Sequence, residues 1–367
     1  MTFLVYGAYG YTGRLLLGEA LRRGHHPIAA GRDGDRLAEL GQDFPGLATR
    51  TFALDDPAAL RRGLTGVEAV LHAAGPFIET GRPMMEAAIG MGVHYLDISG
   101  EVPSFETAFE LNDEAREAGV VLLPGVGLDV IPTDAVAALL HRRLPGATRL
   151  ELALHSPGRP SGGTLQTVVE GVPGGLLVRR DGQLRRVNPG RRGFRRTVDF
   201  GPETPEGPMA GRLGGVRWVT PYTWGDLATA WTTTGIDHIT CYRSAPKRQV
   251  RLLPLLLPLL RAGFALAPVR RVLRRRIARG PDGPSAEKRA TGRTRVWGRV
   301  ENLEGDGAEL VLEVPEGYRF TEIAGIRAVE ALLERGGKGT LTPARAFGPD
   351  WALDLPEVHI VEARPVA

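Results

Sequence analysis

The sequence has very little cysteine: Cys241 is the only one among 367 residues. A lone cysteine excludes an intramolecular disulfide and a cysteine-based zinc site, and it suits a reducing cytoplasm. The eight histidines are scattered, and they form neither a catalytic triad motif nor a metal-ligand spacing. The chain starts with an apolar run only as long as a strand before glycines follow, so we expect no signal peptide. These features favour a cytoplasmic protein without a bound metal.

Acidic residues are absent between Arg243 and Arg279, where eleven Arg and Lys residues occur. The net charge of the whole chain is +4, and it becomes −7 without these eleven residues. The basicity is therefore local, so it does not mark the protein as a nucleic-acid binder. A hydrophobic content of 43% and a charged content of 24% are ordinary for a globular protein. The length is sufficient for two domains.

Short apolar runs alternate with helical patterns through the first third of the chain. "FLVYG" is followed by "YTGRLLLGEALRRG", "HPIAAG" by "DRLAELGQ", and "VEAVLHAAG" by "GRPMMEAAIGMG". Strands that alternate with helices predict βαβ units and a parallel sheet, and right-handed crossovers make that sheet doubly wound. We therefore predict an α/β protein with a Rossmann domain over residues 1–130.

The pattern changes near Arg149, where "RLELALHS" is typical of a strand. "VRWVTPYTWGDLATAWTTTG" carries aromatic and β-branched residues at strand spacing, and a later segment predicts a hairpin around Gly305–Gly307. These patterns predict a second α+β domain with a largely antiparallel sheet over residues 131–320. The amphipathic helix "TEIAGIRAVEALLERGG" opens a last region, 321–367, which we expect to return to the Rossmann domain.

Three glycines stand between the first strand and the first helix, in "LVYGAYGYTGRLL". Gly7 permits a tight turn, Gly10 lets the backbone approach a pyrophosphate, and Gly13 lets the helix pack closely on the sheet. The helix N-terminus then faces the phosphates. A purely structural turn is the alternative, but the strand–turn–helix context favours dinucleotide binding. The predicted contacts in this turn are Gly7, Tyr9, Gly10, Tyr11, Thr12 and Gly13.

The end of the second strand selects the nucleotide. An NAD enzyme usually has an Asp or Glu there, about 20 residues after the glycines, to bind the ribose hydroxyls. This sequence has Arg32 instead, and a guanidinium pairs with a 2′-phosphate that a carboxylate would repel. The cofactor predicted is therefore NADP(H). Asp33 could face the ribose but is expected to cap the next helix, and Asp55 could touch the adenine or cap a helix.

The loops after the fourth and fifth strands complete the predicted cofactor site. "AAGPF" ends the fourth strand at the crevice where a nicotinamide would lie. Ligands bind beyond the carboxyl ends of parallel strands. The residues assigned to the site on this basis are Ala74, Gly75, Pro76, Ser99 and Gly100.

The chain resembles the saccharopine dehydrogenase-like oxidoreductases, and within them the trans-acting enoyl reductases. Motifs spread over almost the whole length carry the resemblance: "GAYGYTGR", "AAGPF", "HYLDISGE", "LPGVGLDVIPTD", "PSGGTLQTVVEG", "WGDLATAWTTTGI" and "YRFTEIAGIRAVEALL". The resemblance implies a Rossmann domain, NADP(H) and a reductase or dehydrogenase activity. It leaves the substrate open, and the arginine-rich stretch 243–279 has no clear counterpart.

Enoyl reduction adds a hydride to the β-carbon, so negative charge grows on the conjugated carbonyl oxygen. A donor at that oxygen and a proton for the α-carbon complete the reaction. Our catalytic candidates are Asp129, after the sixth strand, and Tyr222, in the second domain. Asp129 could instead cap the following helix, and Tyr222 could simply pack in the core. Ser161 and Thr164 occupy a glycine-rich turn suited to small polar contacts.

The segment 251–279 is both apolar and basic. Its eighteen residues Leu252–Val269 hold one charge, Arg261, and three prolines, which argues against a membrane-spanning helix. A basic amphipathic helix here could lie on an anionic membrane, cover the substrate cleft, or contact another subunit of a homo-oligomer. The apolar residues at helical spacing are Leu266, Val269, Leu273 and Ile277.

These features together predict a cytoplasmic NADPH-dependent reductase that acts on the enoyl group of a lipid or polyketide-like substrate. One alternative is an imine or carbonyl reductase of the same fold. Another is a scaffold that binds NADP(H) and recruits a partner through the basic segment, without oxidising the cofactor.

Overall fold

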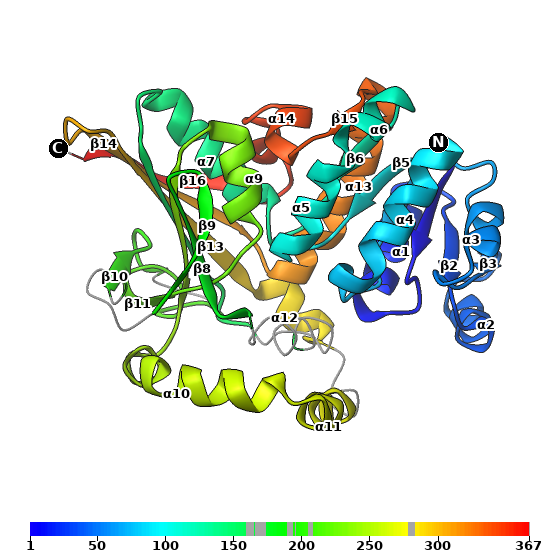
Figure 1. Cartoon of the computed structure of the whole chain (residues 1–367), viewed down its shortest axis with the longest axis horizontal. Helices are drawn as coiled ribbons and strands as arrows, with labels where there is room; N and C mark the ends of the chain where they lie inside the picture. Colours follow the sequence, from blue (N-terminus) through cyan, green and yellow to red (C-terminus); the bar gives the residue numbers. More distant parts are fainter. Residues whose placement is uncertain are drawn as a thin grey trace. The chain divides into compact units, whose positions relative to one another are not determined.

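A computed structural model gives the fold as two compact units (Figure 1). The first unit comprises Met1–Ile131 and Tyr318–Gly348, and the second comprises Pro132–Gly317 and Pro349–Ala367. The structure describes residues 1–158, 165, 174–188, 194, 196–204, 208–277 and 283–366.

The first unit contains a seven-stranded sheet in the order β15-β6-β5-β4-β1-β2-β3. Every strand pair in it is parallel. The chain runs outward from β1 in one direction and then, from β4, in the other, so the strand order reverses between β1 and β4. This confirms the doubly wound prediction. The strands are β1 (Phe3–Tyr6), β2 (Ile28–Gly31), β3 (Thr49–Thr51), β4 (Ala69–His72), β5 (His94–Asp97), β6 (Val121–Leu123) and β15 (Gly339–Thr340).

The segments that follow the strands are helices because their apolar residues recur at helical spacing and form a buried face. In α1, Leu16, Leu17 and Ala20 have no exposed surface. The Glu330 carboxylate of α13 accepts hydrogen bonds from Nε and Nη2 of Arg23, both at 2.7 Å. The late helix therefore belongs to this unit, beside α1. The helices are α1 (Tyr11–Arg22), α2 (Gly34–Asp43), α3 (Pro57–Gly63), α4 (Phe77–Met91), α5 (Val102–Glu110), α6 (Asn112–Glu117), α13 (Gly317–Arg335) and α14 (Pro343–Phe347).

The second unit is built on a mixed sheet whose main path is β10-β11-β12-β7-β13-β14-β16. Only β7 and β12 pair in parallel among its described strands, so the sheet is largely antiparallel, as predicted. The strands are β7 (Arg149–His155), β8 (Leu176–Arg180), β9 (Gln183–Val187), β10 (Arg196–Asp199), β11 (Val216–Pro221), β12 (His238–Ser244), β13 (Arg293–Glu301), β14 (Gly307–Pro315) and β16 (His359–Val366).

Helices of the second unit include α7, which packs directly on the sheet. A Cβ on Gly298 of β13 would overlap Val136 of α7, so a glycine in mid-strand gives the helix its close approach. The helices are α7 (Ile131–Arg143), α9 (Asp226–Thr234), α10 (Lys247–Ala265), α11 (Ala267–Ile277), α12 (Ala286–Thr291) and the 3₁₀ turn η2 (Trp351–Asp354).

Two expectations about this unit are wrong. The tail of region 321–367 does not return to the Rossmann unit, because β16 pairs antiparallel with β14 over Gly307–Glu313. The segment Asp226–Thr234 is a helix rather than a strand. Its threonine hydroxyls bond carbonyls four residues earlier, and Gly235 ends it with a φ of +71°. The helix forms despite its β-branched residues because burial of its apolar face outweighs their lower helix propensity.

Candidate functional site

The three glycines of the first turn are required for three different reasons. Gly7 has a φ of +83°, and a Cβ there would lie 2.8 Å from the Cβ of Ala74. A Cβ on Gly13 would overlap the carbonyl oxygen of Gly7 and lie 2.9 Å from the Cα of Ala8. A Cβ on Gly10 would meet only the Gly7 oxygen, at 3.2 Å. Gly7 and Gly13 are therefore fixed by the protein's own packing, whereas Gly10 borders space that no described residue fills beyond the Gly7 oxygen.

This space lies at the N-terminus of α1. The N-cap residue is Gly10, which has no side chain to cap the helix, and no acidic residue stands in the first turn. The positive end of the helix dipole is thus not neutralised by a local carboxylate, and a pyrophosphate fits there. Tyr11 and Thr12 are half-buried in this first turn, and the Tyr11 ring packs edge-on against Tyr318 at 5.1 Å between centroids.

Two arginines follow β2: Arg32 stands next to the strand end, and Arg36 lies in α2. Arg32 is exposed, and Arg36 places its guanidinium over the Tyr9 ring, 4.4 Å from the centroid. Tyr9 in turn covers Gly31, where a Cβ would overlap the Tyr9 ring. Asp33 accepts a hydrogen bond from the Arg36 N–H at 3.1 Å, so it caps α2 as expected. Sequence reasoning missed Arg36, although its position one helical turn after Arg32 was visible.

Asp55 is exposed and does not cap α3. The cap is the neighbouring Asp56, whose carboxylate accepts from the N–H groups of Ala58 and Ala59 at 3.0 Å. The capping alternative considered for Asp55 is therefore wrong. The charges of Asp55 and Arg32 both act on Tyr6, whose pKa is raised to about 12 chiefly by burial. Both side chains therefore lie near this edge of the sheet, and an adenine contact for Asp55 stays a prediction.

The loop after β4 touches the glycine turn through Ala74 and is tied to the loop after β5. Glu101 accepts hydrogen bonds from the N–H groups of Phe77 and Ile78, at 3.1 and 2.8 Å, and so caps the N-terminus of α4. Gly75 is exposed and Pro76 is half-exposed. The Glu101 carboxylate therefore ties the start of α4, directly after the loop Ala74–Pro76, to the loop after β5. A nicotinamide contact by Ala74–Pro76 stays a prediction.

A buried carboxylate, Asp97, organises the ends of β5 and β6. It accepts hydrogen bonds from the Tyr95 hydroxyl at 2.7 Å and from the N–H groups of Ser99 and Gly125 at 2.8 Å. Burial outweighs these bonds and raises the pKa of Asp97 to about 6. The loops after β5 and β6, at the carboxyl edge of the sheet, thus donate hydrogen bonds to the same carboxylate.

Ser99 is fully buried, and its hydroxyl accepts from the Glu101 N–H at 3.0 Å. A Cβ on Gly100 would lie 2.9 Å from a carboxylate oxygen of Asp129. The structure therefore brings Asp129 against the loop that follows β5. Cofactor contacts by Ser99 and Gly100 stay predictions.

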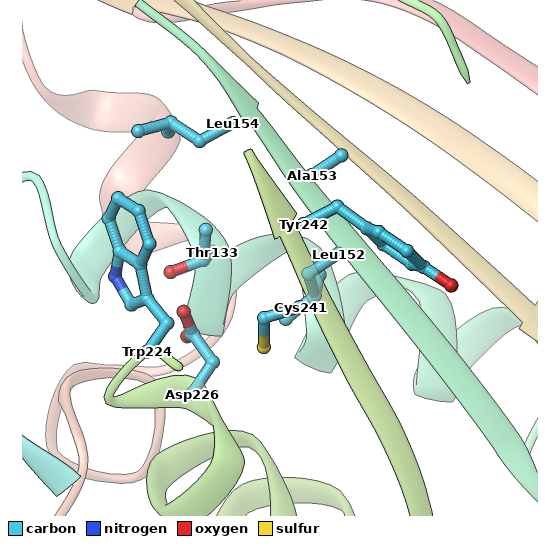
Figure 2. Close-up of a pocket in the computed structure, with 8 residues that line it drawn as sticks. All are labelled: Thr133, Leu152, Ala153, Leu154, Trp224, Asp226, Cys241 and Tyr242. Atoms are coloured by element: carbon cyan, nitrogen blue, oxygen red, sulfur yellow. The ribbon is translucent and has the colours of Figure 1, made fainter. Parts of the chain in front are cut away.

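The second unit has a small hollow between the β7–β12 pair and the start of α9. Figure 2 shows the Thr133 hydroxyl, the Asp226 carboxyl and the Cys241 thiol gathered beside the Trp224 ring. Asp226 and Cys241 are buried, and burial raises the pKa of the Cys241 thiol well above its usual value. The sulfur is therefore a packed, unreactive thiol. The lining residues are Thr133, Leu152, Ala153, Leu154, Trp224, Asp226, Cys241 and Tyr242.

Tyr222 does not line this hollow. Its ring packs edge-on against Trp224, 5.0 Å between centroids, and the guanidinium of Arg243 lies 5.9 Å from its centroid. Asp129 and Tyr222 belong to different units. Ser161 and Thr164 lie outside the described residues, and within the part of the chain that the structure describes no cluster of His, Cys, Asp or Glu could hold a metal ion.

The first unit is similar to a known family of domains. Residues 3–123 match the family described as the saccharopine dehydrogenase NADP binding domain. A probable mitochondrial saccharopine dehydrogenase-like oxidoreductase of Arabidopsis thaliana is 31% identical over 51% of this chain and 46% of its own. A trans-acting enoyl reductase of Mycobacterium ulcerans is 27% identical over 46% of this chain and 43% of its own. The chain thus spans less than half of the length of these relatives.

Among solved structures, apo saccharopine dehydrogenase (L-Glu forming) of Saccharomyces cerevisiae matches with a TM-score of 0.60 at 13% identity. The match covers 100% of both chains, and it shows the fold. The comparisons confirm the predicted resemblance, an NADP-binding oxidoreductase domain and NADP(H) as the cofactor.

Proposed function

We propose that the chain, whose residues 3–123 match the saccharopine dehydrogenase NADP binding domain family, is an NADPH-dependent reductase. The observation that carries the proposal is the room left at Gly10 by the described residues, together with the guanidinium groups of Arg32, just after β2, and Arg36, in the first turns of α2. A glycine whose missing Cβ leaves room at a helix N-terminus suits a pyrophosphate. The guanidinium groups suit a 2′-phosphate.

NADPH, when bound, supplies a hydride from its nicotinamide ring. The residues of this chain bind and orient: the turn Gly7–Gly13 takes the pyrophosphate, and Arg32 takes the 2′-phosphate. The loop Ala74–Pro76, fixed by Glu101, positions the nicotinamide half. Because hydride transfer needs close alignment, this fixed loop is the feature of the site that most directly serves the reaction.

We further propose an enoyl group of a lipid or polyketide-like molecule as the substrate. Similarity to proteins named trans-acting enoyl reductases supports it. In this proposal a donor stabilises the charge that grows on the conjugated carbonyl oxygen, and a proton goes to the α-carbon. Asp129, held against Gly100, and Tyr222 are the candidate donors.

Loss of NADPH absorbance with an enoyl thioester, an imine and a ketone tests the proposal. We expect the enoyl thioester to be reduced, with deuterium from labelled NADPH at its β-carbon. Asp129→Asn and Tyr222→Phe should each lower kcat by about 100-fold or more if that residue is a donor. Tyr242→Phe is the matched control, because that hydroxyl is already bound to Glu151 at 3.1 Å.

Other results have definite meanings. Reduction of only the imine or the ketone overturns the enoyl substrate but still supports an NADPH-dependent reductase activity. NADPH binding without oxidation by any of the three substrates favours a cofactor-binding scaffold. Unchanged kcat in both variants removes Asp129 and Tyr222 from the reaction.

A further inference from the structure

The helix pair α10–α11 presents an apolar face that is exposed among the described residues. Seven of the fourteen large hydrophobic side chains that are exposed in the described chain lie between Leu252 and Val272. Leu255 and Leu259 are each 71% exposed. Contiguous exposed apolar surface of this kind marks an interaction site. The seven residues are Leu252, Leu255, Leu256, Leu259, Leu260, Leu266 and Val272.

The five leucines of α10 lie on one side of the helix. At 3.6 residues per turn, positions 252, 255, 256, 259 and 260 fall within one stripe, which we call the leucine stripe. The opposite side of α10 packs on the rest of the second unit. Val250 is buried, Arg261 lies against Gly175, and Lys247 lies over the Trp218 ring, 5.3 Å from its centroid. The helix is therefore anchored by one face while the leucine stripe points outward.

This finding moves the amphipathic face predicted from the sequence. Of the four expected apolar residues, Leu266 is exposed between the two helices, whereas Val269 and Leu273 are half-buried in α11, and most of the exposed apolar surface belongs to α10. Pro254 and Pro258, two of the three prolines that argue against a membrane-spanning helix, both lie inside α10. Helix α10 tolerates them because each proline removes only one backbone N–H donor, so only two carbonyls lose their intrahelical hydrogen bond.

The helix pair is held in a bent shape. Its two axes differ by 96°, and Arg270 of α11 donates hydrogen bonds to the carbonyls of Phe264 and Ala265, at 2.7 and 3.0 Å. Within the described residues no single helix is long and apolar enough to cross a membrane, although this bent pair passes that test together. An anchored inner face and an apolar outer face fit a helix lying in the plane of an interface.

The charge around the leucine stripe identifies the partner. Residues 243–279 contain eleven Arg and Lys and no Asp or Glu. Arg248, Arg251, Arg271 and Arg275 are exposed. A symmetric contact with a second copy would place two such acid-free surfaces opposite each other, where like charges repel. An anionic bilayer instead offers acyl chains to the leucines and phosphate or carboxylate groups to the arginines.

We propose that α10 and α11 dock the protein on the surface of an anionic membrane, with the leucine stripe buried among the acyl chains and the arginines on the headgroups. The docking is peripheral, and it is independent of cofactor binding and of turnover.

Flotation with vesicles tests the proposal with the full chain and no NADPH. The vesicles contain phosphatidylcholine alone or with about one third phosphatidylserine. We expect flotation with the anionic vesicles, and a decrease at about 1 M salt, where the Debye length is roughly 3 Å. Each of Arg271→Gln and Arg275→Gln should weaken binding about fivefold, the equivalent of about 1 kcal/mol per basic residue.

The leucine stripe has its own variant and a matched control. Leu255→Glu with Leu259→Glu should abolish flotation, whereas Leu303→Glu, at an 84% exposed leucine in the β13–β14 turn, should leave it unchanged. Circular dichroism and light scattering accompany each variant, so misfolding is distinguished from loss of binding.

Flotation that survives the double leucine change overturns the proposal, and so does a wild type that fails to float. A wild-type dimer that the leucine change converts to a monomer assigns the stripe to a subunit contact instead. These results do not bear on NADPH oxidation, so failure here leaves the proposed reductase activity untouched.

Discussion

Three glycines at the start of the chain should respond differently to substitution, and Gly10 is the informative one. Its φ of −72° and ψ of 163° are open to any residue, and its Cβ would meet only the Gly7 oxygen at 3.2 Å. The protein without cofactor should therefore accept Gly10→Val with a change in unfolding free energy below about 1 kcal/mol. The side chain would occupy the space assigned to the pyrophosphate.

The expected loss of NADPH affinity follows from that overlap. Forcing a side chain into an occupied site costs about 1–3 kcal/mol, and a lost charge-assisted hydrogen bond costs about 1.5–3 kcal/mol. Together these predict at least about 3 kcal/mol, or roughly a hundredfold increase in Kd for Gly10→Val. Isothermal titration measures the Kd, and urea denaturation measures the unfolding free energy.

Two further glycines provide the controls. Gly13→Ala should lower the unfolding free energy by about 3 kcal/mol or more, because the new Cβ overlaps backbone atoms of Gly7 that cannot move aside. Gly18 in α1 has nothing within 4 Å of a Cβ, so Gly18→Ala should raise stability by about 0.5–1 kcal/mol and leave the Kd unchanged. Wild-type NADPH affinity in a folded Gly10→Val protein would refute the phosphate cradle.

The remaining predictions concern charge. Arg32→Asp should weaken NADPH binding at least about tenfold while NADH binding changes little; equal wild-type affinity for the two nucleotides in titrations would contradict an NADP(H) site. Arg36→Gln should weaken NADPH binding by about fivefold, and an unchanged Kd would show that Arg36 only packs on Tyr9. Because the pKa of Asp97 is raised from 3.8 to about 6 in the folded protein, stability should fall by up to about 3 kcal/mol as pH rises through that interval. Asp97→Asn, which keeps the acceptor for two N–H groups, should remove that slope in melting curves, and an unaltered slope would assign the titration to another group.

Features that depend on neighbouring residues in the chain were predictable. The Gly7–Gly10–Gly13 spacing, the alternation of strand and helix patterns, the β13–β14 hairpin around Gly305–Gly307 and the Asp33 cap all follow from local sterics or periodicity. The structure reproduces each of them. Arg32 predicted the cofactor because the chemistry of one side chain at a strand end distinguishes the two nucleotides.

Features that depend on residues far apart in the chain could not be predicted from the sequence. Asp226–Thr234 is rich in β-branched residues, yet it is helical because burial of one face outweighs a propensity difference of a few tenths of a kcal/mol per residue. The strand β16 pairs with β14 through backbone hydrogen bonds, and these do not depend on residue type, so the sequence did not reveal the pairing. Helical spacing located apolar residues in 251–279 but could not tell which face the protein covers.

The amino-acid sequence alone thus determined the Rossmann architecture, the cofactor and the basic character of the segment 243–279, because each depends on local pattern or composition. Tertiary structure alone decided that Asp97 joins two loops, that Glu101 caps α4, and that the leucines of α10 face outward. Burial and hydrogen bonding join residues far apart in the chain, so the pairing and the exposed face exist only once the chain has folded.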